Sequence, residues 1–439
     1  MNPLSSPLLT DLYELAMLQA YFEHGMTDTA VFELFVRKLP PRRNFLLAAG
    51  LEQALEFIER LRFGEEEIDW IERSGLFRRD FIARLARLRF TGDVHALPEG
   101  TVFFPDEPLL RITAPLPEAQ LLETRVLNLL HFQTVVASKA ARSRLAAPGK
   151  RLIDVGLRRA HGAEAGLLAA RASYLAGFDG TSTVAAAPLY GIQVFGTMAH
   201  SFVQSHESES AAFRHFAEVF PDNAVLLIDT YDTLEGARKA VEVSKSARVK
   251  GVRLDSGDLG ALAKDVRKIL DAGGLREAII FASGNLDEYR VAELLRAGAP
   301  IDSFGIGTSL VTSADHPYLD AVYKLQEYAG RARRKRSTGK ATWPGRKQVY
   351  RHYAADGGFA RDVVTLEGDA QEGEPLLQQV MRAGRPLMRA SLSASRAHAL
   401  SQLARLPVPL RALDAAPAYP VEISAALRAL AGEVDRATG

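Results

Sequence analysis

Cysteine is absent from this sequence. Without it the protein has no disulfide bonds, no thiolate ligands for metals and no cysteine nucleophile, and its composition is compatible with a reducing compartment. Long apolar runs are also missing, since no stretch approaches the roughly 18 apolar residues that a membrane span needs. Residues 1–9 are broken by prolines and serines and contain no signal-peptide core. We therefore expect a cytoplasmic protein with no membrane partner.

A large excess of either charge is missing as well. The 439 residues include 54 lysines and arginines against 53 aspartates and glutamates, and a net charge of +1 gives no general attraction to nucleic acid. Residues 331–340 form a basic run without any DNA- or RNA-binding motif, so we expect no nucleic-acid partner. Beside a phosphate site, this run could close over an anion. A composition of 47% hydrophobic residues is ordinary for a globular chain of two or three domains.

The middle of the chain alternates short apolar runs with helical patterns, as parallel α/β folds do. Each apolar run ends in polar or glycine-rich sequence, which suggests that these ends share one face. In a β/α barrel that face is the C-terminal rim of the strands, where active sites lie. The expected strands are 151–156, 192–195, 225–228, 251–254, 278–281 and 302–304, and two of the expected helices are 259–272 and 287–297.

The flanking regions have different patterns and predict further domains. Residues 1–130 are expected to form a mixed α/β domain, residues 131–320 the barrel, and residues 321–439 a C-terminal segment that packs back on the first domain. The first domain should contain a helix over 11–24 capped by Thr10, a strand over 30–37, a helix over 45–61, β structure over 92–113 and a helix over 118–130. The C-terminal segment should contain a strand over 318–328, the basic loop and an arginine- and alanine-rich helical tail.

Glycine-rich turns follow two of the expected strands. Gly284 lies in one of them, and Gly305 and Gly307 lie in the next. Free backbone N–H groups in such strand-to-helix turns can hold a phosphate, although each turn alone can equally be structural.

Charged residues gather at the same expected rim. Asp229, Asp232, Asp255 and Asp258 form two acidic turns that suit Mg²⁺ and ribose hydroxyls. The alternative is that Asp232 and Asp258 cap helices. Fixed cations for an anionic substrate come from Arg158, Arg159 and Arg253. Together these residues indicate a sugar phosphate without identifying the acceptor.

Six linked motifs resemble those of the nicotinate phosphoribosyltransferase family. They are Thr10-Asp11-Leu12-Tyr13, Gly156-Leu157-Arg158-Arg159-Ala160-His161-Gly162, Gly177-Phe178-Asp179-Gly180-Thr181-Ser182, Gly196-Thr197-Met198-Ala199-His200-Ser201, Arg253-Leu254-Asp255-Ser256-Gly257-Asp258 and Phe304-Gly305-Ile306-Gly307-Thr308. The resemblance implies a type II phosphoribosyltransferase, with an incomplete parallel β/α barrel beside an N-terminal α/β domain. It also implies a homodimer with sites at the subunit interface.

The resemblance further implies roles for single residues. His200 would be phosphorylated by ATP, a co-substrate. Separately from the resemblance, Asp229 is our candidate to orient the His200 ring, because the two residues follow neighbouring expected strand ends. Asp255 and Arg253 would hold the ribose and the pyridine acid group, with Mg²⁺ bound at ligands that the motifs do not identify. The other implied substrate contacts are Arg158 on the rim, Gly284, Gly305, Gly307 and Thr308 on the 5-phosphate, Lys324, Ser337 and Lys340 on pyrophosphate or ATP, and Tyr13 stacking on the pyridine from the partner subunit.

The implied reaction joins nicotinate to phosphoribosyl pyrophosphate and releases pyrophosphate. It needs no general base, because the pyridine nitrogen has a free lone pair. Relatives that use nicotinamide have an aspartate where Ser182 stands, so the neutral Ser182 favours the acid. Val155 departs from the family, since relatives commonly have an aromatic residue there to stack on the ring. Asp154 and His161 also differ from the commonest form of the motif.

Alternative functions remain open at this point. The chain could use nicotinamide or quinolinate, although quinolinate would need further basic residues and would leave His200 without a purpose. It could also be a catalytically silent protein that binds phosphoribosyl pyrophosphate. The presence of His200, Asp229, Arg253 and Asp255 argues against that alternative.

Overall fold

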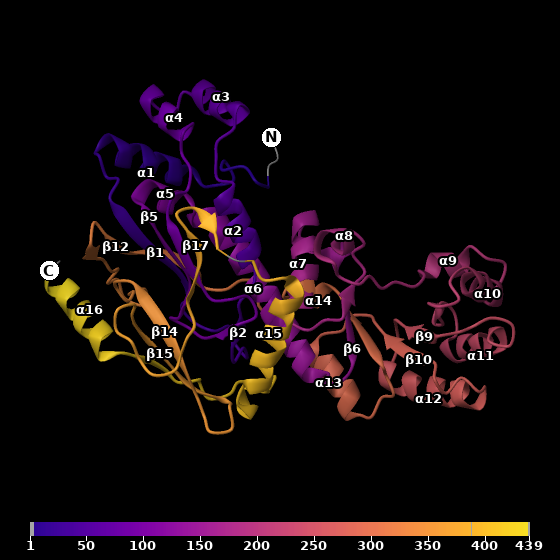
Figure 1. Ribbon diagram of the computed structural model, residues 1–439. Coiled ribbons are helices and arrows are strands. Elements are labelled where there is room, and N and C mark those ends of the chain that lie inside the picture. The colour runs from indigo at the N-terminus through magenta and orange to yellow at the C-terminus, as the bar shows by residue number, and fades with distance from the viewer. Residues whose placement is uncertain (1–3, 388, 438–439) are drawn as a thin grey trace. The chain divides into compact units, whose positions relative to one another are not determined.

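The computed structural model describes residues 4–387 and 389–437 and contains two compact units (Figure 1). Unit 1 comprises Met1–Ser138 and Tyr318–Gly439, and unit 2 comprises Lys139–Pro317. The predicted domain boundaries were 130 and 320, and the predicted C-terminal segment belongs to the same compact unit as the N-terminal residues. Among the described residues, no helix combines the length and apolarity needed to cross a bilayer.

Unit 2 is built on a six-stranded parallel sheet with the order β7-β6-β11-β10-β9-β8. Its strands are β6 (Arg151–Asp154), β7 (Gly180–Thr181), β8 (Val225–Leu227), β9 (Gly251–Leu254), β10 (Ile279–Ala282) and β11 (Ser303–Ile306). The last strand of the unit, β11, pairs with the first, β6, so neighbouring strands follow one another in the chain as they would around a barrel. The two edge strands, β7 and β8, do not pair with each other. The parallel sheet confirms the α/β class, and the incomplete barrel remains a prediction that this strand order supports.

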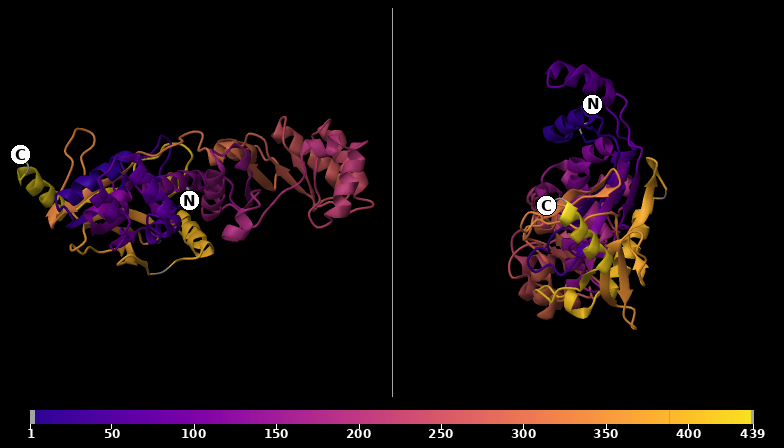
Figure 2. Two further views of the ribbon diagram at one scale, coloured as in Figure 1. Left: turned by 90° about the horizontal axis from the view of Figure 1, so that it is seen from above. Right: turned by 90° about the vertical axis from the view of Figure 1, so that its left-hand side faces the viewer.

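Helices connect the strands of unit 2, and α10, α11 and α12 pack side by side (Figures 1 and 2). The predicted helices over 259–272 and 287–297 are confirmed as α12 and α13. The helical elements are η1 (Leu157–Arg159), α7 (Ala163–Leu175), α8 (Ala186–Tyr190), α9 (His200–Gln204), α10 (Glu209–Val219), α11 (Thr233–Val243), α12 (Leu259–Ala272), α13 (Glu288–Arg296) and α14 (Thr308–Val311).

The predicted strand over 192–195 is wrong. Ile192 is buried, but Gln193 and Val194 are exposed, and one parallel bridge from Val194 to Thr181 is the only ladder contact recorded for this described segment. The run lies at the open end of the sheet, so no strand pairs with its other side. His200 consequently begins helix α9 instead of following a strand.

Unit 1 contains a seven-stranded antiparallel sheet, a four-stranded sheet and a two-stranded sheet. The seven-stranded sheet has the order β13-β12-β1-β5-β3-β17-β18, with β1 (Thr29–Val36) buried from Ala30 onward. Its other strands are β3 (Asp93–Ala96), β5 (Pro108–Pro115), β12 (Ala321–Tyr328), β13 (Arg331–Ala332), β17 (Gln378–Arg382) and β18 (Arg385–Pro386). The smaller sheets are formed by β14 (Lys347–Tyr353), β15 (Phe359–Leu366), β16 (Glu374–Pro375) and β19 (Val421–Ile423), and by β2 (Leu46–Leu47) and β4 (Val102–Phe103).

Most helices of unit 1 come from the N-terminal part of the chain. They are α1 (Leu12–Glu23), α2 (Leu51–Glu59), α3 (Glu65–Ser74), α4 (Arg79–Leu85), α5 (Leu116–Leu121) and α6 (Glu123–Ala146), which continues past Ser138 into unit 2. The C-terminal part adds α15 (Leu392–Arg405), η2 (Val408–Arg411) and α16 (Ala425–Ala437). The tail from Leu376 was predicted to be helical, but within it residues 378–382, 385–386 and 421–423 form strands. One of these, β17, pairs with β3.

Two predicted helices of unit 1 are wrong in extent. The helix expected over 45–61 begins only at Leu51, because Gly50 adopts φ 98° and its N–H donates to Glu99 Oε1 at 2.7 Å. Glu99 is distant in sequence, so this start was not visible locally. The helix expected over 118–130 breaks at Leu122 into α5 and α6.

The predicted cap of the first helix is also wrong. Its N-cap is Asp11 rather than Thr10, and the Asp11 carboxylate accepts a hydrogen bond from Thr124 Oγ1 at 3.0 Å instead of capping.

Candidate active site

Four polar residues meet at the carboxyl ends of β8, β9 and β10. Three of them were predicted site residues, and the fourth, Ser283, precedes the predicted Gly284. Arg253 Nη2 donates to Asp255 Oδ1 at 2.7 Å, and Arg253 Nε donates to Ser283 Oγ at 2.9 Å. The Ser283 hydroxyl donates to the same Asp255 oxygen at 2.5 Å. Asp229 Oδ2 accepts from the Asp255 backbone N–H at 2.9 Å. We call Asp229, Arg253, Asp255 and Ser283 the rim cluster.

Asp255 is ionised by its surroundings. Partial burial alone would raise its pKa, but the Ser283 hydrogen bond and the Arg253 charge together hold the pKa below its usual range. The carboxylate is therefore fully charged at neutral pH.

His200 lies beside the rim cluster at the first position of α9. Its Nδ1 is 3.1 Å from Thr230 Oγ1, and its Nε2 is 3.8 Å from Asp255 Oδ2. The side chain is 41% exposed, which leaves the ring accessible to a substrate. The expectation that Asp229 orients the ring is wrong, because Thr230 occupies that position and Asp229 bonds to Asp255 and Ser256. Thr230 directly follows Asp229 after the same strand. This position was the signal in the sequence that could have identified Thr230 as a site residue.

Asp229 retains an unused acceptor. It is 9% exposed, and its Oδ2 accepts from Asp255 N–H and from Ser256 Oγ at 2.5 Å. Its Oδ1 is buried and has no hydrogen-bond partner within the part of the chain that the structure describes. Such an oxygen can take a further ligand, for example a cation. Within the same residues, no three His, Asp or Glu side chains converge tightly enough to hold a metal ion on their own.

The predicted phosphate turns lie at the ends of β10 and β11. Gly284 has φ 92°, and a Cβ there would lie 1.9 Å from the Asp255 carbonyl oxygen, so only glycine fits. Gly305 lies within β11, Gly307 is the N-cap of α14, and Thr308 is its first residue. Ser309 Oγ donates to the Leu286 carbonyl at 2.6 Å and so joins the two turns.

The predicted pyridine contacts lie at the ends of β6 and β7. Arg158 and Ser182 are exposed, and Val155 is half-buried. Ser182 N–H donates to the Asp154 carbonyl at 2.7 Å, which ties the two strand ends together. Because residue 155 is a valine, this position offers no aromatic ring to stack on the pyridine.

Two of the four acids at the expected rim cap helices. Asp232 Oδ1 accepts from Glu235 N–H at 2.8 Å at the start of α11. Asp258 Oδ1 accepts from Gly260 N–H at 3.0 Å at the start of α12. The capping alternative therefore holds for both, while Asp229 and Asp255 belong to the rim cluster.

Tyr13 lies in unit 1, 47% exposed, in the first turn of α1. It lines a pocket of about 340 Å³ together with Asp11, Glu123, Asn128 and His131. Partial burial and the nearby charges of Glu123, Glu14 and Asp11 raise the pKa of Tyr13, so the ring stays neutral. An exposed aromatic face beside a pocket is suited to stacking on a ring.

The predicted phosphate-binding residues of the C-terminal segment also lie in unit 1. Lys324 on β12 pairs with Glu123 at 3.3 Å. Ser337 and Lys340 are exposed in the loop after β13, where Lys340 N–H donates to the Ser337 carbonyl at 2.9 Å. The base of this loop is anchored by an ion pair of 3.2 Å between Arg334 and Asp435 of α16.

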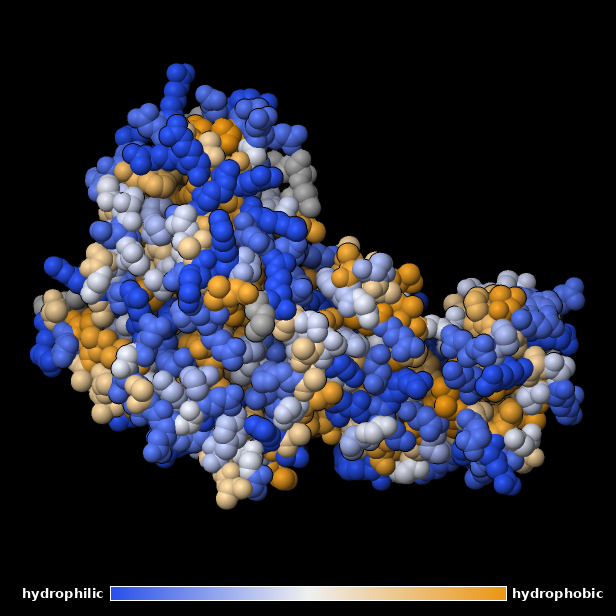
Figure 3. All heavy atoms as spheres, viewed as in Figure 1, coloured by the Kyte–Doolittle hydropathy of each residue, from blue (hydrophilic) through white to orange (hydrophobic). Residues whose placement is uncertain are grey.

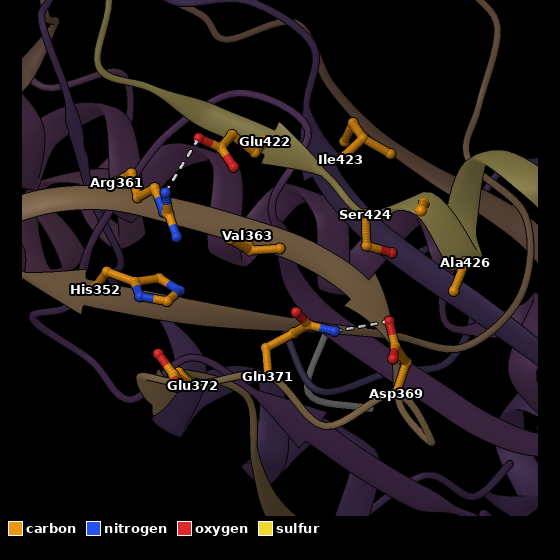
Figure 4. Close-up of a pocket in the computed structure, with 11 residues that line it drawn as sticks. His352, Arg361, Val363, Asp369, Gln371, Glu372, Glu422, Ile423, Ser424 and Ala426 are labelled. Carbon is orange, nitrogen blue, oxygen red and sulfur yellow. Dashed lines mark hydrogen bonds and ion pairs between the residues drawn. The ribbon is translucent and has the colours of Figure 1, made fainter.

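A larger groove of about 640 Å³ lies over β14, β15 and β19 (Figure 4). Arg361 in its wall pairs with Glu422 at 3.8 Å, and the uncharged amide of Gln371 donates to Asp369 at 2.9 Å. None of the predicted site residues is among the described residues that line it. Volume alone therefore does not identify the site.

Comparisons with known proteins connect these residues to one family. Residues 8–131 match the nicotinate phosphoribosyltransferase (NAPRTase) N-terminal domain, and residues 150–340 match the nicotinate phosphoribosyltransferase (NAPRTase) family. A nicotinate phosphoribosyltransferase of Mycobacterium tuberculosis is 50% identical over 424 residues, covering 95% of this chain and 91% of the relative. The human enzyme of that name is 35% identical over 518 residues, covering 97% of this chain and 96% of the relative. The crystal structure of human nicotinic acid phosphoribosyltransferase matches with a TM-score of 0.86 at 32% identity, covering 97% of this chain and 99% of that chain.

Proposed function

The chain belongs to the nicotinate phosphoribosyltransferase family, and we propose that it forms nicotinate mononucleotide and pyrophosphate from nicotinate and phosphoribosyl pyrophosphate. The product would enter NAD biosynthesis by salvage of the free pyridine. The observation that carries this proposal is the 50% identity to an enzyme of that name over 95% of the chain. The rim cluster supports it, because charged and hydroxyl groups at adjacent strand ends suit a ribose phosphate.

The chemistry is a displacement at C1 of the ribose. The nicotinate ring nitrogen forms a bond to C1 with its lone pair as the bond from C1 to the pyrophosphate oxygen breaks. Positive charge develops on the ribose, and the Asp255 carboxylate would stabilise it. Arg253 would hold Asp255 in place and balance its charge, as the 2.7 Å contact suggests.

Coupling to ATP would proceed through His200. A ring nitrogen would attack the γ-phosphorus of ATP, the bond to the bridging oxygen would break, and ADP would leave. Water would later hydrolyse the phosphohistidine and restore the imidazole. The accessible ring and its contact with Thr230 support this role, since the hydroxyl holds the ring in one orientation. Ser337 and Lys340 in the exposed loop would bind phosphate groups.

Mg²⁺ fits the residues present at the rim. The unpartnered Asp229 Oδ1 and the nearby Asp255 carboxylate are hard oxygen ligands, and Mg²⁺ typically takes one or two carboxylates plus substrate phosphates. When bound, the ion would neutralise charge on the leaving pyrophosphate.

The homodimer and the stacking role of Tyr13 are part of the same proposal. Tyr13 would stack on the pyridine bound by the partner subunit. Exposed apolar residues support an interface, because Leu9 and Leu12 precede Tyr13 in unit 1, and in unit 2 Val184 precedes α8 and Leu189 lies in it. Hydrophobic spheres gather over α8 in Figure 3.

Mononucleotide formation by the purified protein tests the proposal. Phosphoribosyl pyrophosphate and Mg²⁺ are supplied with nicotinate, nicotinamide or quinolinate in turn, each with and without ATP. Product from nicotinate, increased by ATP, is expected. Product from another pyridine alone would move the specificity, with Ser182 and Val155 the first residues to change. No product from any pyridine would favour a silent binding protein.

Two variants separate the ATP step from the transfer. His200→Ala should abolish ATP stimulation and keep the fold, whereas Thr230→Val should reduce stimulation because the ring loses its hydroxyl partner. Unchanged stimulation in a folded His200→Ala protein would contradict the phosphohistidine role.

A further inference from the structure

The carboxylate of Asp154 is buried at the carboxyl end of β6, and none of the roles considered above uses it. The residue is 1% exposed. Its Oδ1 accepts from the Gly156 N–H at 2.9 Å, and its Oδ2 accepts from Thr181 Oγ1 at 2.6 Å. Its carbonyl oxygen accepts from Ser182 N–H at 2.7 Å. One residue thus joins the turn after β6 to the end of β7.

The turn after β6 has little room to move. A Cβ on Gly156 would lie 2.2 Å from Val311 Cγ1 of α14, and a Cβ on Gly307 would lie 3.1 Å from the Val155 carbonyl oxygen. The turn is therefore pressed against α14 and against the turn after β11. A small loss of hydrogen bonding at Asp154 would shift the backbone within tight surroundings.

The Thr181 hydroxyl links Asp154 to the residues around Ser182. It donates to Asp154 and accepts from the Thr183 N–H at 3.0 Å. Ser182 lies between these two residues. In Asp154→Asn, the amide N–H would point at Thr181 Oγ1, which already accepts from the Thr183 N–H. The Thr181 hydroxyl proton would then lose the carboxylate oxygen that accepts it.

The ionised form of Asp154 is the one that accepts both hydrogen bonds. Burial raises its pKa to about 6, and the hydrogen bonds from Thr181 and Gly156 oppose that rise. The carboxylate is consequently ionised at neutral pH.

We propose that Asp154 is a positioning residue for the pyridine end of the site. By holding the turn after β6 and the end of β7 in one arrangement, it places Arg158 and Ser182 for nicotinate. It thereby sets the affinity for nicotinate and the preference for the acid over the amide, without touching the substrate itself. This role rests on the proposed nicotinate transfer.

The test compares Asp154→Asn with Thr181→Val, which breaks the same hydrogen bond from the other side and keeps the carboxylate. Both should raise the KM for nicotinate about tenfold or more and change kcat less than about threefold, because ground-state placement is lost. The KM for phosphoribosyl pyrophosphate should stay within about twofold, and the ratio of acid to amide turnover should fall. Thr181→Ser keeps the hydroxyl and should restore the parent values.

Asp179→Asn is the matched control. The Asp179 carboxylate joins the same two strands at their opposite end, accepting from Leu152 N–H at 2.9 Å. It should leave the nicotinate KM unchanged. Folded Asp154→Asn and Thr181→Val proteins with a parental KM, or an equal rise in Asp179→Asn, would overturn the positioning role. If the parent forms no product from nicotinate, the proposed function fails instead, and calorimetric titration with nicotinate then judges the same variants.

Discussion

Two charged pairs, one from each unit, lie in different environments. In unit 1, Arg351 and Asp362 are both 0% exposed and form a bidentate pair, with contacts of 2.9 Å to Oδ1 and 2.5 Å to Oδ2. Tyr419 OH also donates to Asp362 at 3.0 Å. In unit 2, Arg253 and Asp255 are 20% and 29% exposed, and neighbouring Asp229 keeps one oxygen without a partner in the described chain.

The buried pair is expected to contribute to the stability of the fold, whereas the rim cluster is expected to contribute to the reaction. A fully buried pair leaves no polar atom for a ligand, so its removal should affect stability and leave chemistry alone. The rim cluster at the ends of parallel strands is held in place by its own members, and only Arg253 and Asp255 are partly exposed to solvent. Its removal should affect chemistry more than stability.

Breaking the buried pair should have the largest effect. Arg351→Met should lower the free energy of unfolding of unit 1 by about 3–5 kcal/mol, because Asp362 is left buried without its cation. Trp70 and Trp343 are the two tryptophans of the sequence and both lie in unit 1, so their fluorescence in a urea titration reports this unit. The kcat per folded molecule should not change.

Removing both charges is the control for that experiment. Arg351→Met combined with Asp362→Leu should regain part of the lost stability, because Asp362 is no longer left buried without its cation, while the buried Glu107 carboxyl group beside the pair still loses Arg351. A double variant as unstable as the single variant would show that packing around Phe359, whose ring lies 4.2 Å from the guanidinium, dominates instead.

The second effect concerns Asp154, an acid of unit 2 that is 1% exposed. Its folded pKa of about 6 lies above 3.8, the ordinary value for aspartate, so the folded protein binds the proton more tightly than the unfolded chain. This stabilises the fold below pH 4 and is lost as the pH rises through 6, a change of about 3 kcal/mol. Asp154→Asn should remove this component.

Urea titrations between pH 3.5 and pH 7.5 measure it as the difference in unfolding free energy between parent and variant, with hydrogen exchange on β6 and β7 as the local probe. A difference that does not vary with pH would show that Asp154 has an ordinary pKa in the folded state.

Neutralising the rim cluster is expected to affect catalysis. Asp255→Asn should lower kcat/KM for nicotinate about 100-fold, because a preorganised charge is lost where the ribose cation develops. The stability of unit 2 should change by less than about 1 kcal/mol, since the side chain is partly exposed. Steady-state kinetics and a urea titration measure the two quantities. Asp265→Asn on the exposed face of α12 is the matched control, and an equal loss there would contradict the role of Asp255.

Much of the fold could be predicted because periodicity and turn residues are local signals. The helix Leu259–Ala272 agrees with its prediction to the residue, with Asp258 before it as a cap. The start of α2 could not be predicted, because Glu99 determines it from 48 residues away. The run over 192–195 looked like a strand, but a strand also needs a neighbour, and the sheet opens there.

For the candidate site, the sequence indicated which residues lie at the rim better than it indicated which side chains contact one another. The motif indicated that Arg253 and Asp255 lie at the rim but not that they pair with each other, and Thr230, not Asp229, contacts His200. A strand end indicates which residues reach the rim, but the ring partner depends on side-chain rotamers that sequence does not reveal. Asp154 was noticed only as a departure from the motif, since its burial between two strand ends appears only in three dimensions.

The smallest effect sharpens the comparison within the acids at the rim. Asp232 lies three residues after Asp229, yet its carboxylate caps α11 through Glu235 N–H at 2.8 Å. Asp232→Ala should therefore lower the unfolding free energy by about 1 kcal/mol and leave nicotinate turnover unchanged, and Asp232→Ser should retain most of the cap. Urea titration and steady-state kinetics on all three proteins measure this. If Asp232→Ser were as stable as the parent but lost turnover, Asp232 would act on the substrate as well as on the helix. It would then belong with Asp229 and Asp255 among the acids of the site.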